Sequence, residues 1–256
     1  MATDLTQSAE VQVSDLLAAV IALADDHLIL GHRLSEWCGH APMLEEDLAL
    51  PNMALDMLGQ ARALYSYAAE LEGRGRTEDD IAYLRTDREY RNCLLVERPN
   101  GDFAHTMLRQ FYFAAFMQPY WQAMTESSDA TLSAIAAKAV KEIAYHVRHA
   151  GEWVIRLGDG TEESAKRMQA AVDALHPYTD ELVADEDVDF AVVPNRAGMR
   201  ARWEATVGHV FREARLAVPD VAFPLSGGRE GRHGEEFGYL LAELQYMQRT
   251  YPGLTW

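Results

Sequence analysis

The segment from residue 132 to residue 157 carries one unbroken row of small and apolar residues. Alternating steps of four and three residues keep side chains on one face of an α-helix, and a row of this length is typical of a helix buried in a bundle. The row consists of Leu132, Ala136, Ala139, Ile143, His146, Ala150, Trp153 and Leu157. Such a face must be covered by other helices, so the chain is predicted to fold as a helical bundle.

Most other long segments show the same helical period. Predicted helices run from Ser14 to just before Gly39, from after Pro42 to about Leu71, from Phe103 to about Thr125, and from Thr161 onwards, with further helices around Trp203 and Leu244. In the second of these helices, the buried side is predicted to include Leu48, Leu55, Leu58 and Tyr65. No segment alternates as a strand does. We therefore predict an all-α fold in one domain, residues 1–256, with a ferritin-like four-helix bundle core over about 14–184 and additional C-terminal helices wrapped around it over about 185–256.

Charge and composition limit the classes of function. The formal net charge of -17 argues against nucleic acid and anionic membrane as partners, because both would repel the chain. Cys38 and Cys93 are expected to be reduced structural thiols. The first 32 residues contain no Lys or Arg, and no apolar run reaches the ~20 residues of a membrane span. These features predict a cytoplasmic protein.

A bundle of this kind can hold two iron ions when its helices supply the right ligands. Such a site needs a carboxylate from each of two helices and an acid-x-x-His pair from each of the other two. Here Ile143 stands three residues before His146, Gly59 stands three residues after Asp56, and the inward polar residue of the first helix is His27. No acid lies between 103 and 125. Each ligand pair lacks a member, so we predict a degenerate site with no catalytic, cofactor or metal ligands, in which His27 and His146 are core histidines.

Two other acid-x-x-His spacings occur, Asp102 with His105 and Asp173 with His176. Asp102 is better explained as a helix N-cap and His176 precedes a proline, so both are predicted to be ordinary structure. The glycine-rich loop at 226–234 is predicted to be solvated.

The predicted helix from Phe103 to Thr125 is unusually aromatic. It contains Phe111, Tyr112, Phe113, Phe116, Tyr120 and Trp121. Its aromatic residues are predicted to belong to the core. Because they exceed what one buried stripe needs, this helix is also our sequence-based candidate for contact with a partner.

Several motifs together resemble one known family over nearly the whole chain. They are residues 36–42 (EWCGHAP), 47–50 (DLAL), 55–62 (LDMLGQAR), 66–71 (SYAAEL), 94–101 (LLVERPNG), 137–142 (AKAVKE), 145–148 (YHVR), 156–161 (RLGDGT), 241–249 (LAELQYMQR) and the terminal Trp256. The chain resembles the non-catalytic, ferritin-like structural component of the bacterial phenylacetyl-CoA epoxidase (its C subunit), an enzyme also called phenylacetate-CoA oxygenase. The stretch at about 185–235 resembles the family least.

The resemblance implies a structural role in a monooxygenase complex of aerobic phenylacetate degradation. It implies that a homologous catalytic subunit holds the di-iron centre and binds the CoA thioester, that a reductase delivers electrons from NADPH, and that small accessory subunits take part. The resemblance also aligns the ligand motifs of the catalytic subunit with positions of this chain. Asp56 and Gly59 then occupy one acid-x-x-His slot, Ile143 and His146 occupy the other, and the first-helix carboxylate falls at or beside His27. These five positions are the predicted vestigial ligand slots.

Two alternatives of other classes remain open at this stage. One is a stand-alone di-iron or mixed-metal oxidase using Asp56 and His146 with Asp26 and His27 as unconventional ligands. The other is a helical module that binds a CoA thioester without chemistry. Bound iron would favour the first, and affinity of the isolated chain for CoA would favour the second.

Overall fold

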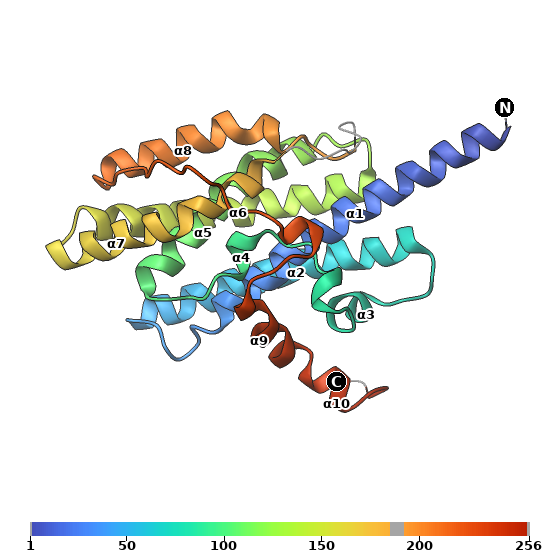
Figure 1. The fold of residues 1–256 in the computed structure, drawn as a ribbon, viewed down its shortest axis with the longest axis horizontal. Coiled ribbons are helices and arrows are strands. Elements are labelled where there is room, and N and C mark those ends of the chain that lie inside the picture. The colour runs from blue at the N-terminus through green and yellow to red at the C-terminus, as the bar shows by residue number, and fades with distance from the viewer. Residues whose placement is uncertain (1, 185–191, 255–256) are drawn as a thin grey trace.

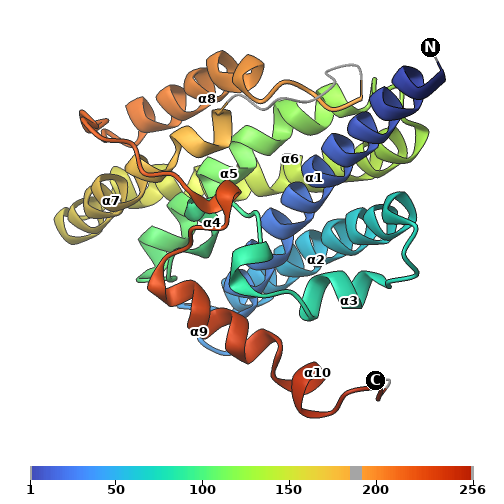
Figure 2. The same ribbon diagram turned by 45° about the vertical axis from the view of Figure 1, so that its right-hand side comes forward.

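The computed structural model in Figure 1 describes the backbone of residues 2–184 and 192–254, and the side chains of these ranges from residue 14 onward. All regular secondary structure in these ranges is helical, which confirms the predicted all-α fold. Four long helices form the bundle: α1 (Ala2–Ser35), α2 (Leu44–Glu72), α5 (Phe103–Met124) and α6 (Ala130–Gly158). Helix α1 packs along α2, α5 packs along α6, and α2 also contacts α6. Figure 2 shows these pairs side by side.

The remaining elements cover the bundle or extend from it. Helices α7 (Glu162–Leu175) and α8 (Arg200–Glu213) lie against α5 and α6. The elements α3 (Glu78–Tyr83), η1 (Asp87–Glu89) and α4 (Leu94–Glu97) connect α2 to α5, and η2 (His176–Tyr178), η3 (Asp180–Val183) and η4 (Ala197–Met199) lie between α7 and α8. After η5 (Gly228–Glu230), the last helices α9 (Glu235–Leu244) and α10 (Tyr246–Thr250) extend away from the bundle (Figures 1 and 2).

Local sequence signals explain where the long helices begin and end. Asp129 caps α6 by accepting hydrogen bonds from the Thr131 and Leu132 amides, both at 2.9 Å. Thr161 caps α7 in the same way through the Ser164 amide. Helix α2 ends at Gly73, whose φ of 63° lies in the left-handed region that favours glycine. These caps satisfy backbone groups that a helix end leaves unpaired.

The row on α6 is buried as its spacing predicts. Its residues from Leu132 to Trp153 are buried, and Leu157 packs against the core at its edge. The core is one continuous apolar cluster that reaches from Ala19 on α1 to Leu241 on α9. The register predicted for α6 is therefore confirmed.

Two predictions about the first half of the chain are wrong in detail. Helix α1 begins at Ala2 rather than at Ser14, and it ends at Ser35, four residues before Gly39. On α2 the buried side includes Leu50, Met57 and Leu64, whereas Leu48 and Leu55 are 59% and 65% exposed. Leucines line both sides of this helix, and the spacing alone does not say which row faces the bundle.

The aromatic helix α5 is enclosed by its own chain. All of its aromatic side chains between 111 and 121 are at most 1% exposed. Helices α6, α7 and α8 all pack against α5, and His27 of α1 contacts the rings of Phe113 and Trp121. Trp203 of α8 donates a hydrogen bond from its indole nitrogen to the Tyr112 carbonyl at 3.1 Å. The prediction that this helix is core is confirmed, and its proposed exposure to a partner is wrong.

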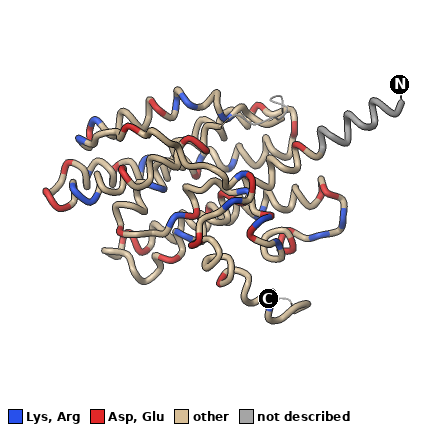
Figure 3. The backbone as a smooth tube through the Cα atoms, viewed as in Figure 1, with Lys and Arg blue, Asp and Glu red and all other residues tan. Residues whose placement is uncertain are grey.

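Three observations concern the rest of the chain. No helix among the described residues has a stretch long and apolar enough to cross a lipid bilayer. Residues 185–191, in the stretch that resembles the family least, lie outside the described residues, as does the terminal Trp256. In the part of the chain that Figure 3 colours, acidic and basic positions are interspersed rather than separated into an acidic end and a basic end.

Candidate functional site

The centre of the candidate site is His146, which lies on the buried row of α6. The side-chain amide of Gln110 donates to His146 Nδ1 at 3.2 Å, and His146 Nε2 donates to Asp56 Oδ2 at 3.0 Å. Both ring nitrogens are therefore engaged by side chains from α5 and α2. A metal ion at either nitrogen would have to displace one of these hydrogen bonds.

His27 of α1 lies in a more apolar part of the same interior. Its Nδ1 donates to the Leu23 carbonyl at 2.7 Å, and its ring contacts Phe113 and Trp121 at centroid distances of 5.3 and 5.6 Å. No described residue hydrogen-bonds its Nε2. Complete burial lowers the pKa of His27 to about 4, so the ring is neutral near pH 7.

The other three vestigial positions are placed very differently from one another. Ile143 is fully buried one turn before His146. The Asp56 side chain is 35% exposed and reaches His146 from the rim of the bundle. Gly59 lies on the outer surface of α2. The nearest neighbour of a Cβ atom at this position would be Lys138 Nζ, at 4.0 Å. The structure thus brings Asp56 and His146 into contact and leaves Gly59 apart from them.

The donor set does not fit a carboxylate-bridged pair of iron ions. Two divalent ions in a buried site need several carboxylates to offset their charge. Here a single partly exposed acid, Asp56, contacts His146, and an isoleucine occupies the position one turn before that histidine. Among the described residues, no group of three or more His, Cys, Asp or Glu side chains is arranged to hold a metal ion.

The carboxylates beside His27 face other partners. Asp25 accepts hydrogen bonds from Arg85 Nη1 at 3.0 Å and from the Arg91 amide at 2.7 Å. Asp26 accepts two parallel hydrogen bonds from Arg229, at 2.7 and 3.0 Å. Both acids are fully buried. They act as anchors for arginines, and the sequence gives no signal of this because Arg85 and Arg229 are 60 and 203 residues away.

The loop at 226–234 is anchored to the protein interior, so the prediction that it is solvated is wrong. Glu181 accepts hydrogen bonds from the amides of Gly227 and Arg229 at 3.0 and 3.2 Å. Glu97 accepts one from the Gly234 amide at 2.7 Å. At Gly228, a Cβ atom would lie 2.2 Å from the Asn92 carbonyl oxygen, so only glycine fits this approach. The glycines serve close packing rather than mobility.

The two other acid-x-x-His pairs also have structural roles. Asp102 caps α5 by accepting a hydrogen bond from the His105 amide at 3.0 Å, and it pairs with the His105 ring at 2.7 Å. The His176 ring hydrogen-bonds the Tyr112 hydroxyl at 3.0 Å. Both outcomes agree with the sequence-based interpretation.

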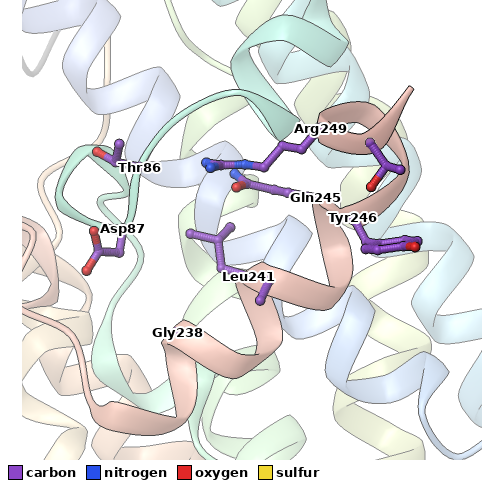
Figure 4. A pocket seen from close by; sticks show the side chains of 9 residues that line it. Thr86, Asp87, Gly238, Leu241, Gln245, Tyr246 and Arg249 are labelled. Carbon is purple, nitrogen blue, oxygen red and sulfur yellow. The ribbon is translucent and has the colours of Figure 1, made fainter. Parts of the chain in front are cut away.

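A surface pocket of about 400 Å³ lies between η1 and the C-terminal helices. Figure 4 shows Thr86 and Asp87 on one side and Leu241, Gln245, Tyr246 and Arg249 on the other. Arg249 donates to the Arg85 carbonyl, and Gln245 donates to the same oxygen at 2.7 Å. A CoA thioester carries several phosphate charges, and this pocket offers one cation that already has a backbone partner.

Comparison with known proteins is decisive for the family. Residues 1–256 match the family described as phenylacetic acid catabolic protein. A protein of Escherichia coli strain K12, named as the C subunit of 1,2-phenylacetyl-CoA epoxidase, is 45% identical over 249 residues, which cover 95% of this chain and 100% of that protein. The chain belongs to the phenylacetic acid catabolic protein family. The resemblance read from the motifs is thereby confirmed.

Within this member of the phenylacetic acid catabolic protein family, His27 makes stability depend on pH. The pKa of an unfolded histidine is about 6.5, and burial lowers the pKa of His27 to about 4. Between these values the unfolded chain binds a proton that the folded chain does not, so the free energy of unfolding falls as the pH drops from 6.5 towards 4. A difference of one bound proton changes the free energy of unfolding by about 1.4 kcal/mol per pH unit.

The His27→Leu variant is expected to lose this part of the slope. Urea unfolding at pH 5 and pH 7 measures it as the difference in the free energy of unfolding between the two conditions. His32, whose pKa burial also lowers to about 4, keeps its own contribution in the variant. Ile29→Ala is the control, because it removes buried apolar volume from the same helix without removing a titrating group. A slope equal in His27→Leu and wild type would contradict the prediction.

Proposed function

We propose that this chain is the non-catalytic structural subunit of a multicomponent monooxygenase that epoxidises the aromatic ring of phenylacetyl-CoA in aerobic phenylacetate degradation. The observation that carries the proposal is the closed set of hydrogen bonds around His146, which takes both ring nitrogens where a catalytic bundle would place metal ligands. The name of the Escherichia coli relative supports the choice of reaction.

In the proposed complex, the chemistry belongs to a homologous catalytic subunit. That subunit holds the di-iron centre, and a reductase that uses NADPH supplies electrons, with small accessory subunits as further members of the assembly. This chain contributes a packed helical body against which the catalytic subunit is held. The proposal places the complex in the cytoplasm and includes no metal or other cofactor in this chain.

The buried side chains support this role over a stand-alone oxidase. An oxidase would need Asp26 and His27 as ligands beside Asp56 and His146. Asp26 is ion-paired with Arg229. Burial lowers the pKa of His27, so its ring is neutral near pH 7, and the ring packs against Phe113 and Trp121.

Reconstitution tests the proposal. Turnover of phenylacetyl-CoA by catalytic subunit plus reductase is measured with and without this chain, and the iron content of the isolated chain is determined. We expect turnover to depend on the chain although the chain carries no stoichiometric iron. Equal rates and equal stability of the catalytic subunit in both mixtures would refute the structural role. About two irons per chain with oxygen-dependent turnover would instead establish the stand-alone oxidase.

A further inference from the structure

Helix α2 presents a second row of residues, on the side facing away from the bundle. Leu44, Leu48 and Leu55 are 70%, 59% and 65% exposed, and Gly59 continues the row one turn further. The steps of four, seven and four residues keep all four on one face of the helix. An exposed row of leucines with the spacing of a helix seam is what a helix shows when a second helix packs on it.

The neighbouring outer face of α6 carries exposed cations, one of which, Lys138, is ion-paired with Glu142 of the same helix at 3.4 Å. Lys138, Lys141, Tyr145 and Arg148 follow one another at steps of three and four, and all four are exposed. Three of them are cations, in a chain whose formal net charge is -17. The Arg148 guanidinium lies 5.6 Å from the centre of the Tyr145 ring.

These two rows form one continuous surface. A Cβ atom at Gly59 would lie 4.0 Å from Lys138 Nζ, so the rows meet there. Gln60 donates to Glu142 at 2.8 Å, and His146 donates to Asp56 at 3.0 Å, which fixes the two helices against each other just beneath the surface. We call the surface formed by Leu44, Leu48, Leu55, Gly59, Lys138, Lys141, Tyr145 and Arg148 the α2–α6 face.

The composition of this face defines the partner that fits it. The leucine row needs an apolar helix surface, and Gly59 allows a partner backbone to approach closely. The cation row on α6 requires acidic side chains beside that apolar surface, because charge complementarity selects partners and steers association. A second copy of this chain is disfavoured, because Asp56 and Glu142, the acids between the two rows, already bind His146 and Lys138 and are not free to meet the cations of another copy.

We propose that the α2–α6 face docks the homologous catalytic subunit, through helices whose apolar side chains cover the α2 leucines and whose Asp or Glu side chains meet the α6 cations. This inference rests on the proposed function. It assigns the contact to a defined surface and excludes α5, which the chain encloses itself.

The test compares charge-changing variants on and off this face. Leu48→Glu/Leu55→Glu breaks the apolar row, and Lys138→Glu/Lys141→Glu reverses the charge of the α6 row. The matched controls are Val218→Glu/Phe223→Glu, at residues 57% and 85% exposed in the segment between α8 and η5, and Lys166→Glu/Arg202→Glu, at exposed positions of α7 and α8. Circular dichroism and thermal unfolding establish that each variant is folded.

Calorimetric titration with the purified catalytic subunit gives Kd for each variant. Both face variants are expected to weaken binding at least about tenfold, which corresponds to about 1.4 kcal/mol. Both controls are expected to bind as wild type does. Raising the ionic strength should weaken wild-type binding and have much less effect on the charge-reversed variant, because salt screens exposed charges.

The outcomes separate this inference from the proposed function. If wild type fails to bind the catalytic subunit, the proposed function itself is wrong. If wild type binds and the face variants bind equally well, the function stands and the α2–α6 face is wrong. If the wild-type chain self-associates and the face variants abolish only that, the face belongs to a second copy of the chain and the inference is overturned.

Discussion

The Asp25→Ala variant is expected to lose about 3–5 kcal/mol of the free energy of unfolding, because it leaves a buried cation without its counter-ion. Arg85 is 5% exposed and directs Nη1 at Asp25, with its guanidinium 4.2 Å from the centre of the Tyr90 ring. The Asp25 carboxylate also accepts hydrogen bonds from the Tyr65 hydroxyl and the Arg91 amide. Burial alone would lower the pKa of Arg85, but the charge of Asp25, its hydrogen bond to the guanidinium and the nearby Tyr65 and Tyr90 hydroxyls together outweigh burial and raise that pKa. Without Asp25 the cost of burying the guanidinium remains and its compensation is gone.

Urea unfolding at pH 7 measures this loss. Asp180→Ala is the control, since its ion pair with Arg200 is about half exposed on both sides. Exposed pairs of this kind contribute at most about 1 kcal/mol. The double variant Asp25→Ala/Arg85→Met is expected to recover part of the loss, because it removes the unpaired charge together with its partner. A loss in Asp25→Ala no larger than in the control would show that the buried pair is not needed for stability.

The features predicted correctly from sequence depend on local periodicity. The α6 row, the caps at Asp102 and Thr161, and the buried positions of Ile143 and His146 follow from residues close together in the chain. A helix of period 3.6 places such residues on one face whatever surrounds them. For the same reason, the sequence alone shows that Ile143 occupies the position three residues before His146 where a di-iron bundle has an acid.

The features that sequence missed depend on partners far along the chain. Helix α2 has leucines on two faces, and the positions of α1 and α6 decide which face is buried, so the prediction for Leu48 and Leu55 is wrong. Exposed leucines are not rare in themselves, because burial of apolar residues is a one-way rule. Their regular spacing on α2 is the observation on which the proposed α2–α6 face rests.

The buried acids of α1 illustrate the same limit at the candidate site. Asp25 and Asp26 stand beside His27 on an apolar helix, a pattern that favours metal ligation when read alone. Their partners, Arg85 and Arg229, come from segments far along the chain, which the helical period of α1 does not reach. The anchoring of the 226–234 loop was missed for the same reason, since Glu97 and Glu181 lie far from it in sequence.

The Trp153→Ala variant is expected to lose about 3–5 kcal/mol of the free energy of unfolding, and Ile143→Ala about 2–5 kcal/mol, through lost apolar burial and the cavities left behind. Trp153 is 9% exposed and packs edge-to-face on Phe103 at a centroid distance of 5.0 Å. Phe103 in turn contacts Trp37 at 5.8 Å, so the indole links α6 to the first turn of α5 and to the turn after α1. Removal of the indole therefore affects three segments at once.

Thermal and urea unfolding of Trp153→Ala, compared with Glu152→Ala, measure this effect. Glu152 is the neighbouring residue on α6 and is exposed, so its truncation is expected to change stability by no more than about 0.5 kcal/mol. Trp153→Phe keeps an aromatic ring against Phe103 and should lose less than the alanine variant. An unchanged midpoint in Trp153→Ala would place the residue on the surface. That result would rotate the whole α6 row outward, and with it Ile143 and His146, so the same measurement tests the register on which the degenerate site depends.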